Sequence, residues 1–285
     1  MAALLIILAS CTGKVEGVLI KRYNAKHKNG GFIFTGLVAL FSMLFFVLTD
    51  RNGFYFPSGI FPYGLVSGVM FCVASFTTYV ALGCGPFTIT MLILSYTGVS
   101  TILFGLVFLH EQASVFTYIG FALIMISLFL TRGERHKEKE KKASHKWLIC
   151  VILTFVSKSV FSILMRFQQI QFENACSNEY MIITLGLAAL VLLVVGIIRA
   201  GRDLPYILRY GGLYAAVSGL CNGATNLMGL AINMLMPISI ASPIQTGVGI
   251  ITSFILSKII FKEKFLIRQV IGVIIGGAAL IFLNF

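Results

Sequence analysis

Ten apolar stretches, separated by short polar segments, dominate the hydrophobic pattern of this chain. They cover residues 2–20, 32–48, 60–82, 86–109, 115–131, 147–165, 180–198, 212–232, 237–260 and 267–283. Each is close to the roughly 17 to 25 residues that an α-helix needs to cross a bilayer. A membrane β-barrel would instead alternate apolar and polar positions over segments of about ten residues, and these stretches do not alternate. The pattern therefore predicts an all-α membrane protein with ten transmembrane helices.

The second half of the chain repeats landmarks of the first half. The matched pairs, separated by 144 to 152 residues, are Lys14 and Lys158, Arg22 and Arg166, Gly68 and Gly219, Pro86 and Pro237, Glu111 and Glu263, and Gly120 and Gly272. Similarity at a nearly fixed spacing indicates an internal repeat of about half the chain. In an apolar chain, such a duplication is typical of transporters.

A charged segment, RGERHKEKEKKASHK at residues 132–146, separates the two repeats. It divides the chain into a first five-helix repeat at 1–131 and a second five-helix repeat at 147–285. Because five is an odd number, the second repeat enters the membrane from the opposite side, so the sequence predicts two inverted repeats. We interpret the segment between them as a basic cytoplasmic linker that sets the topology and contacts anionic lipid.

Composition and charge support this interpretation. Hydrophobic residues make up 58% of the 285 residues and charged residues only 11%, whereas a soluble domain has about 25% charged residues. The net charge of +12 does not indicate nucleic-acid binding, because the basic residues lie in short loops between apolar stretches. If successive loops alternate between sides, 17 Lys and Arg residues fall on one side and only Arg51 and Arg166 on the other. The positive-inside rule makes the first side cytoplasmic. It therefore places both termini on the outer side of the cytoplasmic (cell) membrane.

Metal and cofactor chemistry is not expected from this sequence. The six Cys residues show no Cys-x-x-Cys spacing, and His110-Glu111 is not followed by a second His at the spacing of a zincin helix. We therefore predict neither a metal site, nor a cofactor, nor catalytic residues, and we predict that the protein is not an enzyme.

Ionisable residues within the apolar stretches are candidates for a functional site, because charges in a bilayer are costly and tend to face a cavity or a partner. Lys14 and Lys158 occupy matching places in the two repeats. Inverted repeats bring equivalent residues together about an axis, so both lysines are predicted to bind one anionic group. The alternative is snorkelling, because each lysine precedes Arg22 or Arg166 by eight residues, or roughly 12 Å of helix.

Glu16 is the candidate for coupling transport to protons. It lies two residues from Lys14, and such positions do not share a helix face, so Lys14 need not be its partner. The alternative is an ion pair with Lys21 or Arg22 at the membrane interface.

Polar residues within the stretches extend the predicted substrate-binding site. Asn222 and Asn226 are four residues apart and share a helix face. Tyr79, Tyr96 and Gln245 complete the predicted set of polar lining residues. The alternative for each is a hydrogen bond between helices with no role in binding.

Pro243 is the candidate helix hinge, because it lies within a predicted helix, where proline removes a backbone hydrogen bond. Its alternative is a simple kink, which is common in transmembrane helices. Pro86 and Pro237 instead begin predicted helices, a favoured position for proline. Glu111 and Glu263 are best explained as acids at the positive end of a helix dipole.

The chain resembles the drug/metabolite transporter superfamily, in particular its ten-helix EamA-type branch. The residues that carry the resemblance are Pro86, Glu111 and Gly120 in the first half and Pro237, Pro243, Glu263 and Gly272 in the second. The resemblance covers essentially the whole chain. It implies two inverted five-helix repeats, a central cavity lined by the first, third and fourth helices of each repeat, and alternating access without ATP.

These observations lead to one functional hypothesis. The sequence predicts a secondary active transporter that moves a small polar or anionic metabolite, or a drug, across the cytoplasmic membrane by alternating access. Its predicted partners are that small molecule and the lipid bilayer, without nucleic acid, and the protein is expected to be a monomer or a homodimer. The alternative is a lipid-linked sugar flippase or a lipid-modifying membrane enzyme. Such enzymes usually cluster Asp, His or Arg residues at one membrane face, and no such cluster is present in the sequence.

Overall fold

The computed structural model describes residues 2–27, 30–50, 53–85, 87–95, 97–108, 115–131, 145–261 and 267–282, and these residues are helical apart from short connections. The α-helices are α1 (Ala2–Lys26), α2 (Gly31–Thr49), α3 (Ile60–Cys84), α4 (Phe87–Ser95), α5 (Thr97–Val107), α6 (Val115–Thr131), α7 (His145–Gln171), α8 (Ser177–Ala200), α9 (Leu204–Leu235), α10 (Ile238–Leu256) and α11 (Ile267–Phe282). A 3₁₀ turn at Gly201–Asp203 precedes α9, and a π-helical turn at Ser257–Phe261 follows α10. The prediction of an all-α protein is confirmed.

Several helices are suited to span a membrane. Six helical segments in the described residues are long and apolar enough, namely Ala2–Lys26, Gly31–Thr49, Ile60–Cys84, His145–Gln171, Ser177–Leu235, which combines α8 and α9, and Ile238–Ile260. Shorter apolar helices occupy Thr97–Val107, Tyr118–Ser127 and Val270–Ala279. Their length and composition are consistent with a multi-pass membrane protein.

Most helices begin within three residues of the predicted start, but polar turns extend some of them, and α9 begins eight residues before residue 212. Thus α1 continues six residues past the predicted end at residue 20, and α7 begins at His145, two residues inside the predicted linker. Hydropathy marks only the part of a helix that suits hydrocarbon, whereas the helix itself continues into the polar interface. The predicted stretch 86–109 contains two helices, α4 and α5, and residues 132–144 lie outside the described residues.

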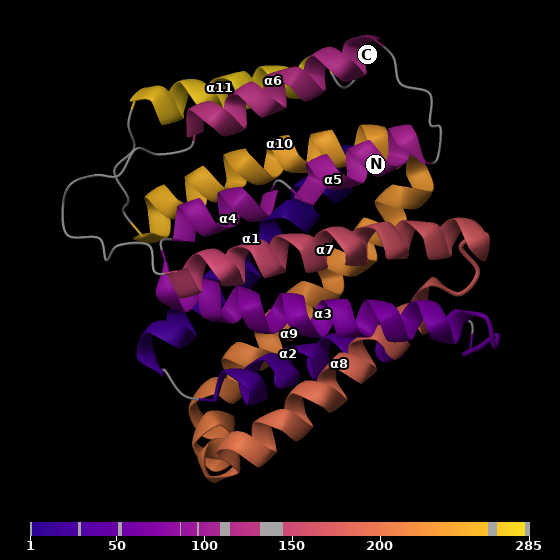
Figure 1. Cartoon of the computed structure of the whole chain (residues 1–285), viewed down its shortest axis with the longest axis vertical. Helices are drawn as coiled ribbons and strands as arrows, with labels where there is room; N and C mark the ends of the chain where they lie inside the picture. The colour runs from indigo at the N-terminus through magenta and orange to yellow at the C-terminus, as the bar shows by residue number, and fades with distance from the viewer. Residues whose placement is uncertain are drawn as a thin grey trace.

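Three helix pairs pack in antiparallel orientation, α2 with α8, α5 with α10, and α6 with α11. Along each pair, the residue numbers of contacting side chains increase on one helix and decrease on the other. The contacts that show this are Ile33 with Gly196 and Gly36 with Leu193, Gly98 with Thr246 and Thr101 with Ser242, and Ser127 with Gly272 and Phe129 with Arg268. In Figure 1, the α6–α11 pair lies at one end of the long axis and the α2–α8 pair at the other.

Two further antiparallel contacts, α1 with α9 and α3 with α7, form the middle of the molecule. Each contains a hydrogen bond between two threonine hydroxyls, from Thr12 to Thr225 at 2.8 Å and from Thr77 to Thr154 at 2.7 Å. Hydroxyl pairs of this kind join transmembrane helices, because the hydrocarbon offers them no other partner. These contacts fix the central helices around the interior space described below.

Gly68 and Gly219, which recur in the sequence, lie at close contacts between helices. A Cβ atom on Gly68 of α3 would lie 3.0 Å from the carbonyl oxygen of Thr184 on α8. On Gly219 of α9 it would lie 2.5 Å from the Cβ of Phe41 and 2.7 Å from the carbonyl oxygen of Val38, both on α2. The recurring glycine is therefore required by the α3–α8 contact in the first half and by the α9–α2 contact in the second, because a side chain would separate the two backbones.

Charged side chains separate between the two ends of the helical bundle. One end holds the C-terminus of α1 and the N-terminus of α9, because Tyr23 packs on Gly211 and His27 bonds to Tyr206. Within the described residues this end carries the acid Asp203 and the basic side chains Lys21, Arg22, Lys26, Lys146, Arg199, Arg202 and Arg209. The opposite end carries mainly acids, Asp50, Glu173 and Glu179, together with Arg166. We call the first end the basic end.

Candidate functional site

A cavity of about 340 Å³ lies in the interior of the molecule. Helices α1, α3, α4, α5, α7, α9 and α10 supply most of its lining, and α2 adds two residues. The volume is near the lower end of the roughly 300–1,000 Å³ that ligand pockets occupy. The cavity is therefore large enough for a small organic molecule.

Three charged side chains line this cavity, Lys14 and Glu16 from α1 and Lys158 from α7. Lys158 lies within electrostatic reach of Glu16 and also of Lys14. Neither lysine snorkels to an interface, because both line the interior cavity, and this placement excludes the snorkelling alternative. The two lysines that match in the sequence repeat therefore face the same space.

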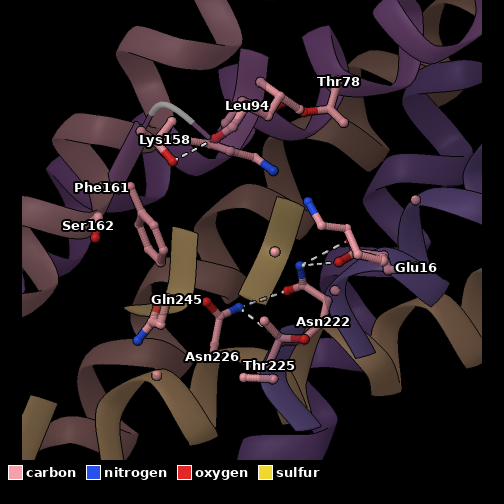
Figure 2. A pocket seen from close by; sticks show the side chains of 18 of the residues that line it. Glu16, Thr78, Leu94, Lys158, Phe161, Ser162, Asn222, Thr225, Asn226 and Gln245 are labelled. Atoms are coloured by element: carbon pink, nitrogen blue, oxygen red, sulfur yellow. Dashed lines mark hydrogen bonds between the residues drawn. The ribbon is translucent and has the colours of Figure 1, made fainter. Parts of the chain in front are cut away.

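An uninterrupted set of hydrogen bonds begins at the Glu16 carboxylate. The side-chain amide of Asn222 donates to both Glu16 oxygens, at 3.1 and 3.2 Å. The side-chain oxygen of Asn222 in turn accepts a hydrogen bond from the Asn226 amide at 3.0 Å and another from the Ser42 hydroxyl at 3.1 Å. Figure 2 shows Glu16, Asn222 and Asn226 joined in this way on one side of the cavity, with Lys158 and Phe161 across from them. Glu16 is thus held by α9, and not by an ion pair with Lys21 or Arg22.

Apolar side chains flank Lys158 on the opposite wall of the cavity. Phe161 and Met165 of α7 lie three and seven residues after Lys158, which places all three on one helix face. The ring of Phe161 meets the ring of Phe71 edge to face, with centroids 5.6 Å apart. Met91 of α4 adds a flexible apolar side chain to the lining beside Gly17 of α1. The cavity therefore combines a side that carries Glu16 and two asparagine amides with a side on which Lys158 lies beside aromatic rings.

The structure brings together six of the predicted site residues. Lys14, Glu16, Lys158, Asn222, Asn226 and Gln245 all line the cavity. Their shared location agrees with the sequence prediction, while their roles in binding stay a prediction. Tyr96 lies outside the described residues.

Tyr79 does not reach the cavity. It is 4% exposed and packs among Tyr23 and Phe34 near the basic end, where its hydroxyl donates to the His27 carbonyl at 3.4 Å. The cavity face of α3 carries Thr78, the preceding residue, and one residue is a rotation of about 100° on a helix. The inclusion of Tyr79 among the lining residues is therefore wrong as to its position.

Pro243 lies inside α10, which runs without a break from Ile238 to Leu256. Its side chain is buried and does not line the cavity, but its neighbour Ser242 does. The Ser242 hydroxyl accepts from Thr101 at 2.8 Å, and its carbonyl accepts from Thr246 at 2.8 Å. The hinge role stays a prediction, since the continuous helix shows no separation into two halves.

Several lining residues are not among those predicted from the sequence. Thr225 lies between the two asparagines on α9, and Ser162 follows Lys158 by one helical turn, so spacing from a predicted residue was the available signal. Phe71 and Phe161 offered no signal, because an aromatic residue in an apolar stretch faces lipid as readily as a cavity. Among the described residues, no group of three or more His, Cys, Asp or Glu is arranged to hold a metal ion.

Comparison with known proteins gives a fold and no family. No family model and no curated protein matches this sequence. Among solved structures, one described only as "Crystal structure of protein" matches with a TM-score of 0.62 over 97% of this chain and 98% of the other, at 13% sequence identity. The chain thus shares a fold over nearly its whole length with a protein of known structure. At this identity, the likeness concerns the fold alone.

Proposed function

We propose that this protein is a secondary active transporter of small anionic or polar metabolites. The observation that carries the proposal is the interior cavity in which Lys14, Glu16 and Lys158 meet within helices suited to a membrane. Charged groups at such a depth are costly unless they face a ligand, water or one another. A cavity of this kind suits a molecule that must be held in passage across a bilayer.

Helix packing supports an architecture of ten transmembrane helices in two inverted five-helix repeats. If α1 corresponds to α7, α2 to α8, α3 to α9, α5 to α10 and α6 to α11, the contact of α1 with α9 has its counterpart in that of α7 with α3. Likewise, α2 packs on α9 as α8 packs on α3. A twofold axis in the membrane plane would make counterparts antiparallel, and α2–α8, α5–α10 and α6–α11 are antiparallel.

Two matched aromatic pairs support alternating access in this architecture. Tyr23 of α1 contacts Tyr214 of α9 at the basic end, with ring centroids 6.1 Å apart. Their counterparts, Phe167 of α7 and Tyr63 of α3, contact each other at the opposite end with centroids 6.0 Å apart. Tyr23 is fully buried, whereas Phe167 is 39% exposed. We assign this difference in exposure to a conformation that is closed at the basic end. In a second conformation, the basic end would open and the opposite end would close.

The charge distribution supports a place in the cytoplasmic membrane. The basic end lies in the cytoplasm if the positive-inside rule applies. The N-terminus of α1 and the C-terminus of α11 belong to the opposite end, since Lys26 ends α1 at the basic end and Arg268 begins α11 beside the end of α6. Both termini are accordingly assigned to the outside.

Glu16 is the residue that we assign to proton coupling. The titratable groups around it are Lys158 from α7, Cys221 from α9 and, on its own helix, Lys14. A proton on Glu16 removes a negative charge from the lining, so proton binding and anion binding favour each other. An acidic gradient should accelerate uptake into proteoliposomes by the native protein, and Glu16→Gln should transport without this acceleration. An unchanged gradient response in Glu16→Gln would exclude the assignment.

The resemblance to EamA-type drug/metabolite transporters agrees with this proposal, as does a cavity lined by the first, third and fourth helices of each repeat. The alternative, a flippase or lipid-modifying enzyme, predicts a site that opens toward lipid at one membrane face. The cavity instead gathers its charges from α1 and α7 in the interior. Transport is therefore the better-supported function.

The proposal is tested by neutralising both lysines in purified protein reconstituted into liposomes. The double variant Lys14→Gln, Lys158→Gln should lose uptake of organic anions, because no positive charge then remains in the described lining. Lys26→Gln is the matched control, since Lys26 lies on α1 but is exposed at the basic end. Elution as a single species in size-exclusion chromatography would show that both variants fold. Full uptake by the double variant would contradict the proposal.

A further inference from the structure

The charges and walls of the cavity restrict the substrate further than transport alone requires. We propose that the substrate is an organic monoanion with a compact apolar body, such as an aromatic monocarboxylate. This inference rests on the proposed function, because it concerns the molecule that the same cavity would carry. It follows from three observations: the net charge of the lining, the placement of its lysines, and the aromatic wall beside them.

The first observation is a charge balance. When Glu16 is ionised, the described lining residues carry two ammonium groups, on Lys14 and Lys158, and one carboxylate, on Glu16, which leaves a net charge of +1. An unbalanced charge inside a membrane protein is expensive because little water is present to solvate it. A monoanion balances this charge, whereas a dianion would leave −1 and a cation would leave +2. The cavity is thus matched to one negative charge.

The second observation places that charge. Lys14 and Lys158 come from different repeats and lie within electrostatic reach of each other, so their like charges repel. Glu16 relieves part of this repulsion from the α1 side, but both of its oxygens already accept from Asn222. A carboxylate between the two lysines would relieve the rest and accept charge-assisted hydrogen bonds. The anionic group is therefore expected between Lys14 and Lys158.

The third observation concerns the rest of the ligand. Phe161 and Met165 follow Lys158 on the same face of α7, and Phe71 meets Phe161 edge to face. A flat apolar group bound to this wall would continue the edge-to-face packing while its carboxylate reaches Lys158. The cavity of about 340 Å³ limits this body to a small one. Figure 2 shows Phe161 between Lys158 and Gln245, so a ligand that contacts the ring also lies near a polar amide.

Other classes of small molecule satisfy fewer of these features. Inorganic phosphate and sulfate are small enough, but they have no apolar part for Phe71 and Phe161. A neutral sugar leaves the net positive charge unbalanced, and an amine brings a second unbalanced charge to the lysines. An aromatic monocarboxylate meets the charge, the wall and the volume together.

The test uses four ligands that share one ring and differ in charge: benzoate, phthalate, benzamide and benzylamine. In neutral buffer these are a monoanion, a dianion, a neutral molecule and a cation. Thermal unfolding of the purified protein measures binding, because a ligand that binds the folded state raises the melting temperature. We expect benzoate to raise the melting temperature of the native protein more than the other three. A larger shift with phthalate, benzamide or benzylamine would overturn the inference.

Two variants test the charge balance directly. Glu16→Gln raises the net charge of the described lining to +2, so the preference should move from benzoate to phthalate. Lys14→Gln lowers it to zero and should weaken benzoate binding at least tenfold. An unchanged preference for benzoate in a folded Glu16→Gln protein would overturn the charge argument. If the Glu16→Gln variant fails to fold, the ligand series on the native protein and on Lys14→Gln still tests the charge argument.

A third variant tests the aromatic wall. Phe161→Ala should weaken benzoate binding about two- to tenfold, since an aromatic contact contributes roughly 0.5–1.5 kcal/mol, and should leave acetate binding nearly unchanged. Equal losses for the two ligands would exclude a role of the ring in selection. Counterflow of labelled benzoate in proteoliposomes separates this inference from the proposed function. Selective binding without counterflow would overturn transport and preserve the ligand class, whereas counterflow of a cation would overturn the ligand class and preserve transport.

Discussion

The close contact of α2 with α9 makes a quantitative prediction about Gly219. In Gly219→Ala, the new methyl group would lie 2.5 Å from the Cβ of Phe41 and 2.7 Å from the Val38 carbonyl oxygen. Carbon atoms pack best at about 3.5–4.0 Å, so the two helices must separate by roughly 1 Å. Neither neighbouring atom is the end of a flexible side chain, and movement of the backbone is the available response.

The expected cost follows from three contributions. Overpacking costs about 1–3 kcal/mol, and separation of the helices would break the bond of 2.7 Å from the Ser42 hydroxyl to the Gly219 carbonyl, at about 0.5–1.5 kcal/mol. Alanine regains about 1 kcal/mol in helix propensity over glycine. The balance is a destabilisation of roughly 2 kcal/mol. Ser42 also bonds to Asn222, so the change should reach the Glu16 side of the cavity.

Gly212 provides a matched control on the same helix, because a Cβ there meets no atom within 4 Å. Gly212→Ala should raise stability by up to about 1 kcal/mol through helix propensity alone. Thermal unfolding in detergent measures both variants, with a shift of about 2 °C or more per kcal/mol for a chain of this size. We expect Gly219→Ala to melt at least 4 °C below the native protein. A melting temperature equal to or above that of Gly212→Ala would refute the close contact of α2 and α9.

Three further predictions concern the cavity and its surroundings. Asn222→Leu removes both hydrogen bonds to the partly buried Glu16 carboxylate, at a cost of about 1.5–3 kcal/mol. The variant should melt lower and lose anion uptake, and native uptake would contradict the role of Asn222. Tyr79→Phe removes only a long bond to the His27 carbonyl, so its substrate affinity should equal that of the native protein; a large loss would return Tyr79 to the site. Trp147→Phe removes the 3.0 Å hydrogen bond from the indole to the Thr90 hydroxyl, which joins α7 to α4. The variant should lower stability by about 1 kcal/mol and leave ligand selectivity unchanged. The four-ligand binding series would check this selectivity.

The sequence predicted helices well because their signal is local. Each apolar stretch contains the core of an observed helix, since hydrocarbon allows few alternatives to a helix for an apolar segment. It predicted helix ends less well, as α1 and α9 show, because their terminal turns are polar and still helical. The number of transmembrane helices and their inverted arrangement stay proposals, supported by which helices pack together.

For the candidate site, the sequence by itself determined which side chains were unusual. Lys14, Glu16 and Lys158 stood out because ionisable groups in apolar stretches are costly, and that cost is a property of the residue and its segment. Asn222 and Asn226 stood out because their spacing of one helical turn is visible in the sequence. These signals needed no knowledge of how distant helices pack.

Only the tertiary structure decided which of these residues meet. It placed Glu16 on Asn222, 206 residues away, and it separated Tyr79 from the cavity although Thr78 lines it. It also selected Phe71 and Phe161 from many aromatic residues as one wall. The physical reason is that hydropathy gives every apolar residue the same preference for the membrane, whereas the rotation and close packing of each helix decide whether its side chain faces lipid, a neighbouring helix or the cavity.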